Sequence, residues 1–123
     1  MIETLDHLII AVQDLDEAEE NYKKIFGISP VWKGVHKELG TANVIFNFKN
    51  TYFELLSASG NGPGADLVNN QLKENGEGML GLVLGTEDIN STEAILKDKG
   101  FSVSDVSLGE GKNIENDLSL IHI

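Results

Sequence analysis

The segment from Leu5 to Gly27 constrains the fold more than any other part of this 123-residue chain. It opens with an eight-residue, largely apolar run that contains His7 and is too short for a helix of its own, so it predicts a strand. Asp14 and Glu17 then have capping-box spacing, and Gly27 stands where a left-handed residue ends a helix. The segment therefore predicts a strand followed by a helix, with one histidine on the strand.

The same pattern returns 74 residues later, where Asp88 stands in the place of Asp14, and Gly100 follows where Gly27 ended the first helix. A repeat of this length indicates one supersecondary unit used twice and packed against its own copy. The first copy reads as a strand, a helix and three more strands. The second copy runs out before its last strand.

We therefore expect a single α+β domain over residues 1–123 in which tandem βαβββ modules form a curled mixed sheet with the helices outside. Module one spans 1–58, a linker and helix span 59–78, and an incomplete module two spans 79–123. Pro30 cannot donate to a strand ladder, so the strand around it is expected at a sheet edge. The expected elements after Gly27 are strands at 28–35, 43–48 and 51–57, a helix at 65–74, a strand at 79–86, a helix at 87–100 capped by Asn90 and Glu93, a strand at 101–106 and a glycine-rich loop at 108–112.

The end of the chain carries an expectation of its own. By the repeat, the last strand of module two would fall near position 128, so the domain is expected to be truncated at its C-terminus. Residues 118–123 fit a third strand of module two, and they also resemble a peptide translated from adapter DNA. A missing strand leaves a sheet edge open, which favours pairing with another chain, so a homodimer is one expectation.

Charge and composition exclude several classes of function. Nine lysines, no arginine and twenty acidic residues give a net charge of −11, which disfavours nucleic-acid and membrane-surface partners. The lack of arginine removes the usual bidentate clamp for carboxylate or phosphate groups. The lack of cysteine removes disulfides and thiolate chemistry. With no secretory signal and no long apolar run, a cytoplasmic location is the default.

Three stretches together resemble the vicinal oxygen chelate superfamily, which includes glyoxalase I, extradiol dioxygenases, methylmalonyl-CoA epimerase and bleomycin-resistance proteins. They are the opening strand Leu5–Val12, the strand Tyr52–Leu56 that closes the first copy, and a loop with the residues of a glyoxalase-like domain, His36, Gly40, Thr41 and Asn43. The resemblance covers residues 5–106.

The resemblance implies a divalent metal ion, Zn, Ni, Fe or Mn, that is chelated by two adjacent oxygens of a small-molecule substrate. His7 falls on the first-strand ligand and Glu54 on the fourth-strand ligand, and Glu54 would also move the proton. The third ligand position is Gly81, which has no side chain. The fourth lies in the missing strand, so the implied metal site is incomplete.

Each of these residues also has a simpler interpretation. His7 fits a satisfied polar group on a sheet face, and Glu54 would then hydrogen-bond His7, Tyr52 or solvent. His36, Thr41 and Asn43 are expected to orient a substrate together with Tyr52, or else form an ordinary turn. The aromatic side chains of this module fit a core better than a surface for ligand stacking, and they are Trp32, Phe46, Phe48 and Tyr52.

Three functions follow from these alternatives. The first is a metal-dependent lyase, isomerase or dioxygenase of the glyoxalase-like kind. The second is a metal-free protein that binds and sequesters a small molecule, as bleomycin-resistance proteins do. The third is an inactive fragment of either.

Overall fold

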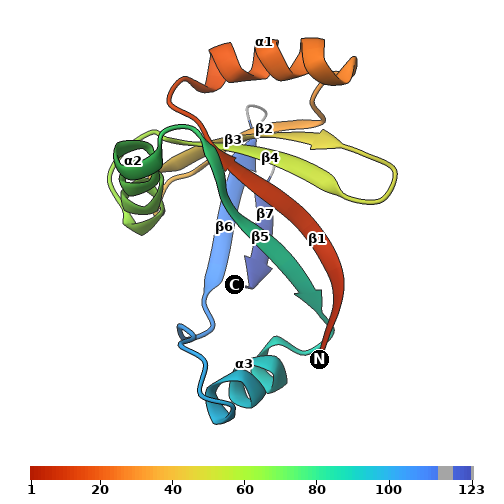
Figure 1. Ribbon diagram of the computed structural model, residues 1–123, viewed down its shortest axis with the longest axis vertical. Helices are drawn as coiled ribbons and strands as arrows, with labels where there is room; N and C mark the ends of the chain where they lie inside the picture. Colours follow the sequence, from red (N-terminus) through yellow and green to blue (C-terminus); the bar gives the residue numbers. More distant parts are fainter. Residues whose placement is uncertain (114–117, 123) are drawn as a thin grey trace.

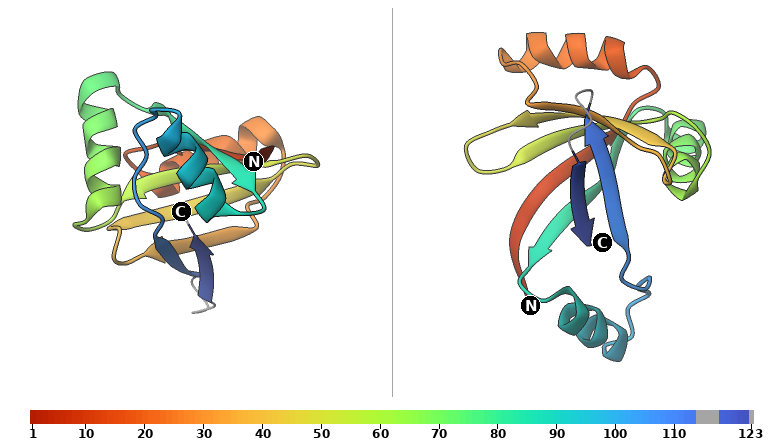
Figure 2. Two further views of the ribbon diagram at one scale, coloured as in Figure 1. Left: turned by 90° about the horizontal axis from the view of Figure 1, so that it is seen from below. Right: turned by 180° about the vertical axis from the view of Figure 1, so that it is seen from behind.

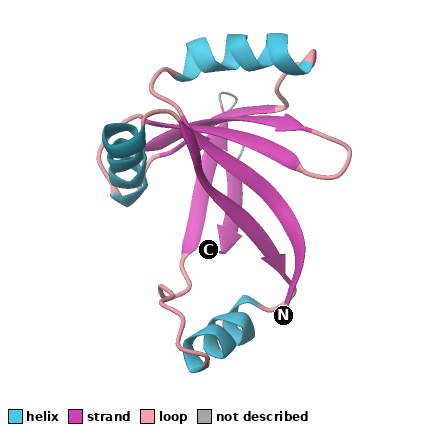
Figure 3. Ribbon diagram, in the orientation of Figure 1, coloured by secondary structure: helices cyan, strands magenta, loops and turns pink. Residues whose placement is uncertain are grey.

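The computed structural model of the chain describes residues 1–113 and 118–122. Its strands and helices build one curled mixed sheet with the helices outside, which confirms the expected α+β class (Figures 1 and 3). The elements are β1 (Ile2–Ala11), α1 (Leu15–Phe26), β2 (Trp32–His36), β3 (Thr41–Asn47), β4 (Tyr52–Ala58), α2 (Pro63–Asn75), β5 (Gly78–Thr86), α3 (Ile89–Asp98), β6 (Leu108–Asn113) and β7 (Leu118–His122). No helix in these described ranges is long and apolar enough to cross a membrane.

Strand β1 joins the two modules. The order across the described sheet is β5-β1-β4-β3-β2-β6-β7, and β1 runs parallel to β4 and antiparallel to β5. The sheet curls strongly along this order, so β1 and β5 on one side and β6 and β7 on the other turn away from α1 (Figures 1 and 2). The curl leaves a concave face on the side of the sheet opposite α1.

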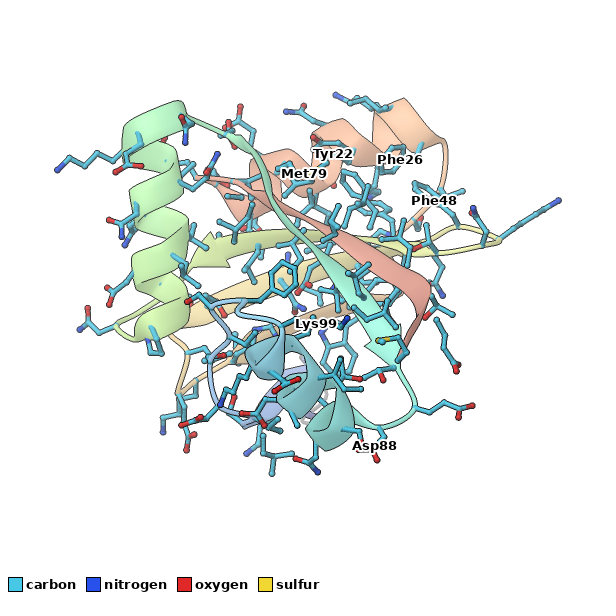
Figure 4. The ribbon with its side chains drawn as sticks, turned by 60° about the horizontal axis from the view of Figure 1, so that its bottom comes forward. Tyr22, Phe26, Phe48, Met79, Asp88 and Lys99 are labelled. Carbon is cyan, nitrogen blue, oxygen red and sulfur yellow. The ribbon has the colours of Figure 1, made fainter. Side chains whose placement is uncertain are left out.

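The hydrophobic core lies between α1 and the convex face of the sheet. Val44, Phe46 and Leu55 are completely buried there, and an aromatic cluster from α1 packs around them. Figure 4 shows Tyr22 and Phe26 extending from α1, with Phe26 edge-on to Phe48 at a ring separation of 5.0 Å. Since side chains alternate along a strand, burying this set on the convex face places the residues between them on the concave face.

The helix ends follow capping chemistry, with one departure from expectation. Asp14 accepts a hydrogen bond from the Glu17 amide at 3.0 Å, and Gly27 ends α1 in the left-handed conformation at φ 70°, as predicted. The predicted cap of α3 by Asn90 and Glu93 is wrong. Asp88 is the cap, because its carboxylate accepts from both the amide and the hydroxyl of Ser91.

Strand β2 is not the edge strand that Pro30 indicated. The strand begins at Trp32, after the proline, so Pro30 costs the ladder no donor. β2 pairs with β3 on one side and with β6 on the other, where Gly34 stands opposite Asn113. It therefore lies inside the sheet.

The second module departs most from expectation. Residues 101–107 form no regular element, although an alternating pattern predicted a strand at 101–106. The glycine-rich stretch expected as a loop is instead β6, which pairs with β2 and β7. Glycine weakens a strand in isolation, but at Gly111 the lack of a side chain lets β6 lie against His36 and Trp32, where a Cβ would come within 3.1 Å of the His36 ring.

Candidate functional site

A chain of hydrogen-bonded side chains crosses four neighbouring strands on the concave face. It starts on β1, passes through β4 and β3, and ends on β2, and its members are Asp6, His7, Glu54, Asn43 and Trp32. Strand register explains this alignment, because His7 stands opposite Tyr52, Ile9 opposite Glu54, and Asn43 opposite Leu56. Residues in register, or two apart on the same strand, share one face of the sheet.

The two predicted metal ligands are in direct contact at the centre of this chain. His7 Nε2 lies 3.0 Å from Glu54 Oε1, with side-chain exposures of only 7% and 10%. A buried carboxylate needs a partner, and His7 supplies one. Of the partners that the simpler interpretation left open for Glu54, which were His7, Tyr52 and solvent, His7 is in hydrogen-bond contact.

Asp6 holds the other side of the His7 ring, which the sequence did not predict. Its Oδ1 lies 2.7 Å from His7 Nδ1. Strict alternation would place Asp6 on the opposite face, but the β1–β5 register shifts between Leu5 and His7. An irregularity of this kind changes the direction in which a side chain points, and here it turns Asp6 towards His7. The only sign of this contact in the sequence is that an acid stands directly before the histidine.

Two carboxylates contact His7 and favour its charged form. Burial disfavours the imidazolium, but the hydrogen bonds with Glu54 and Asp6 and the negative charge of both outweigh it, so the pKa of His7 is raised above its ordinary value of 6.5. Protonated His7 donates one hydrogen bond to each carboxylate.

Asn43 and Trp32 fix the far side of Glu54. The Asn43 amide nitrogen donates to Glu54 Oε2 at 2.7 Å, and its carbonyl oxygen accepts from the Trp32 indole nitrogen at 3.0 Å. Trp32 reaches Asn43 across Gly34, where an added Cβ would come within 2.7 Å of the indole nitrogen. Trp32 was expected in the core, and the glycine two residues after it is the signal for its actual place on the concave face.

Tyr52 completes the surroundings of His7. Its ring stacks on the imidazole with centroids 4.0 Å apart and planes 16° from parallel. Burial, reinforced by the carboxylates of Asp6 and Glu54, raises the pKa of the Tyr52 hydroxyl. Tyr52 therefore stays neutral and lies beside the pair, whereas Phe46 is in the core as expected.

His36 and Thr41 form a separate pair at the β2–β3 hairpin. His36 Nδ1 lies 2.9 Å from the Thr41 hydroxyl, and Thr41 is almost fully buried. Burial lowers the pKa of His36, against the opposing charge of Glu54. The loop residues of the glyoxalase-like resemblance are thus divided, with Asn43 bound to Glu54 and His36 bound to Thr41.

The donor chemistry of His7 and Glu54 fits two ligands of one divalent ion. Imidazole nitrogen and carboxylate oxygen are both ligands that Zn and related ions accept, and a bound ion would take the place of the 3.0 Å hydrogen bond between Nε2 and Oε1. Asp6 on Nδ1 is the kind of outer contact that orients a ligating imidazole. Gly81 contributes no third ligand, and its missing Cβ faces open space.

No group of three or more ligating side chains is gathered within residues 1–113 and 118–122. The fourth expected ligand position lies outside the described residues. A groove of about 1020 Å³ lies elsewhere, along the first turns of α1, with Asp14, Glu17, Lys33 and Ser57 in its lining. It contains neither His7 nor Glu54, so it is not part of the concave site.

Comparison with known families identifies the class of protein. The family described as "Glyoxalase-like domain" matches residues 5–117, which is most of the chain. The chain therefore belongs to the glyoxalase-like domain family, and its sheet has the vicinal oxygen chelate fold. A comparison with curated proteins finds no match.

Solved structures with the same fold include several epimerases. A methylmalonyl-CoA epimerase in complex with methylmalonyl-CoA and NH4+ superposes with a TM-score of 0.73 at 24% identity, covering 99% of this chain and 94% of the other. An epimerase of the same name from Mycobacterium tuberculosis gives 0.71 at 20% identity, covering 99% and 79%. A hypothetical protein from Bacillus halodurans gives 0.72 at 15% identity, covering 97% and 92%. At these identities the likeness shows the fold alone.

Proposed function

We propose that this chain is a small-molecule isomerase or lyase in which Glu54 transfers a proton on the concave face of the sheet. The observation that carries the proposal is the fixed Glu54 carboxylate, whose Oε1 is bound by His7 and whose Oε2 is bound by Asn43. A carboxylate held in one orientation and largely shielded from water is suited to general acid–base catalysis. The isomerase class is also that of the epimerases that share the fold.

The proposed step is proton abstraction from a carbon next to a carbonyl group. Glu54 Oε2 has a second lone pair beside its contact with Asn43, and this atom takes the proton while the electron pair of the broken C–H bond moves to the carbonyl oxygen. Return of the proton to carbon gives the isomer and restores the carboxylate. Asn43 and Trp32 hold the base in place, and Tyr52 limits access of water to His7.

His7 and Glu54 would hold a divalent metal ion, with Asp6 orienting the imidazole. A bound ion would act as a Lewis acid towards two adjacent oxygens of the ligand. The net charge of −11 and the lack of arginine favour a ligand without phosphate groups, so the CoA ligand of the epimerase structure is not proposed for this chain.

Solvent deuterium exchange tests the proton transfer directly. Small α-hydroxy ketones and 2-hydroxy aldehydes are incubated with the protein in D2O, with and without Zn, Ni, Fe or Mn, and NMR follows deuterium entering the carbon next to the carbonyl. Glu54→Gln should slow exchange by at least about 100-fold, whereas Glu77→Gln should leave it unchanged. Exchange that is equally fast in Glu54→Gln would exclude Glu54 as the base.

Metal uptake is tested separately by elemental analysis after reconstitution and dialysis. His7→Ala should abolish retention of the ion, and His36→Ala serves as the matched control because it removes a histidine that lies outside the pair.

A metal-free binding protein is the second candidate function, favoured by the fact that His7 and Glu54 form a hydrogen bond with each other without an ion. It predicts ligand-induced shifts in melting temperature that EDTA does not change.

A further inference from the structure

The groove along α1 lies on the convex face of the sheet, where side-chain size changes along the helix. Near the C-terminal end of α1, Tyr22 and Phe26 fill the space against the sheet, and the Tyr22 ring lies 5.2 Å from that of Phe53 (Figure 4). Near its N-terminal end the strands offer the small side chains of Ala42 and Ser57. The difference leaves a hollow of about 1020 Å³, which is large enough for a small organic molecule.

Ser57 places a buried hydroxyl in the wall of this groove. It stands opposite Ala42 in the β3–β4 register, and its side chain is on the convex face because Glu54 is on the concave one. The residue is only 5% exposed, and no hydrogen bond joins its hydroxyl to any group in the described part of the chain. Since a buried hydroxyl without a partner costs free energy, Ser57 marks a place where a ligand can supply the missing hydrogen bond.

The same end of the groove is acidic. Its charged lining residues are Asp14, Asp16, Glu17, Glu77 and Lys33. Lys33 is already paired with Asp16 at 2.7 Å, and Asp14 accepts from a backbone amide as the helix cap. The Glu17 carboxylate has no ion-pair or hydrogen-bond partner among residues 1–113 and 118–122. The start of a helix attracts anions, but the surplus of carboxylates here favours a cation.

The other end of the groove is mainly apolar. Its lining there includes Tyr22 and Ile25, and Ile25 is 69% exposed. From Asp14 to Ile25 the helix rises by about 16 Å, so the groove is long enough for an extended ligand. The lining therefore suits a molecule with a cationic head and an apolar tail.

We propose that the groove along α1 binds a primary amine with an apolar tail, at a site separate from the concave face. The ammonium group donates a hydrogen bond to Ser57 Oγ and pairs with the Glu17 carboxylate, and the tail follows α1 towards Tyr22 and Ile25. A primary amine is charged at neutral pH, as lysine is. Covering Ile25 with the tail removes exposed apolar surface from water.

Isothermal titration with octylamine at low ionic strength tests the proposal, with butylamine and octanoate as comparison ligands. Octylamine should bind saturably at one site per chain. Butylamine should bind more weakly because its tail covers less apolar surface, and octanoate should not bind because it carries the opposite charge. No saturable binding of octylamine, or equal binding of octanoate, would overturn the proposal.

Glu17→Gln should weaken octylamine binding about tenfold or more, which is the usual effect of losing one charged contact. Glu87→Gln is the matched control, because it removes the same charge at an exposed position after β5, outside the groove, and it should change nothing. Equal weakening in both variants would mean that the net charge of −11 attracts the amine without a site. Loss of binding in Glu54→Gln would place the amine on the concave face instead.

Ser57→Ala gives a second test that includes a measurement without ligand. It should weaken octylamine binding, whereas Ser102→Ala, which removes an exposed hydroxyl, should not. Because the Ser57 hydroxyl is buried without a partner, Ser57→Ala should also keep or raise the melting temperature of the free protein. A lower melting temperature with unchanged octylamine binding would show that this hydroxyl serves the fold and not a ligand.

Discussion

At the scale of residues, the concave site is a set of polar groups that satisfy one another. Glu54 is hydrogen-bonded to His7 on β1 and to Asn43 on β3, the two strands beside its own, so its position depends on the register of the sheet and not on a loop. The buried side-chain amide of Asn43 makes two hydrogen bonds, accepting one from Trp32 and donating one to Glu54. Removing it would take away the partner of Glu54 Oε2 and the partner of the Trp32 indole nitrogen.

Asn43→Leu should therefore destabilise the fold by about 2–3 kcal/mol, the cost of leaving buried polar groups without partners. Asn47→Leu is the control on the same strand and the same face, where the side chain is exposed, and it should change stability by less than about 0.5 kcal/mol. Urea denaturation measures both free energies of unfolding. Equal losses would show that Asn43 is not a structural link to Glu54.

The two histidines should give stability opposite dependences on pH. The pKa of His7 is raised in the folded state, so its contribution is complete below its ordinary value of 6.5 and is lost as pH rises through the raised pKa. The pKa of His36 is lowered by burial, so its contribution is complete above 6.5 and is lost as pH falls through the lowered pKa.

Urea denaturation between pH 5 and 9, with EDTA present, tests both signs. The stability difference between wild type and His7→Gln should shrink as pH rises, and the difference for His36→Gln should shrink as pH falls. Parallel pH profiles for the two variants would contradict the assigned surroundings of these side chains.

At the scale of elements, the β2–β6 junction depends on glycine. A Cβ at Gly34 would come within 2.4 Å of the Lys112 carbonyl oxygen and within 2.7 Å of the Trp32 indole nitrogen. The first contact is to backbone, so a side chain here must push β6 away from β2. The second would displace the indole from Asn43, which connects the junction to the candidate site.

Gly34→Ala should cost about 1–3 kcal/mol, in line with overpacking, whereas Gly81→Ala should cost little because its Cβ meets nothing within 4 Å. Trp32 is the chain's single tryptophan, so its fluorescence reports the junction directly. We expect a red-shifted emission for Gly34→Ala and none for Gly81→Ala. An unshifted spectrum in Gly34→Ala would show that Trp32 does not depend on this contact.

The elements that the sequence predicted are those with strong local signals. The Leu5–Gly27 strand and helix carry their own apolar run, cap and stop glycine, and they form as expected. β6 was missed because its stability comes from pairing with β2, far away in sequence, and a window rich in glycine shows nothing of this. The 101–106 pattern alternates, but it acquires no neighbouring strand to pair with.

The candidate site, like the fold, was predictable only in part from the sequence. The resemblance to the vicinal oxygen chelate superfamily implied that His7 and Glu54 share one site, and their contact was one of the alternatives that the residues left open. The role of Asp6 required a register irregularity, and that of Trp32 required the space left by the missing side chain of Gly34. The acid before His7 and the glycine after Trp32 are the only traces of them in the sequence. Geometry of this kind is a property of packed strands and not of local sequence.

At the scale of the whole molecule, the curl of the sheet brings module two to the candidate site through β5. Gly81 stands opposite Ile9, and Ile9 stands opposite Glu54, so the three positions share the concave face. The backbone therefore places position 81 where the third expected metal ligand would stand, but glycine has no side chain to bind an ion. Since open space surrounds the missing Cβ, a larger residue can be accommodated there.

Gly81→His should convert the two-ligand pair into a three-ligand site and tighten divalent metal binding by at least tenfold, because each added imidazole raises affinity for Zn or Ni. Isothermal titration with Zn and Ni measures the change. Gly81→Ala is the control for backbone effects, and Gly81→His combined with His7→Ala should lose the gain if both histidines bind one ion. If the double variant binds Zn or Ni as tightly as Gly81→His alone, the ion lies away from the His7–Glu54 pair. Position 81 of module two would then not be part of the candidate site.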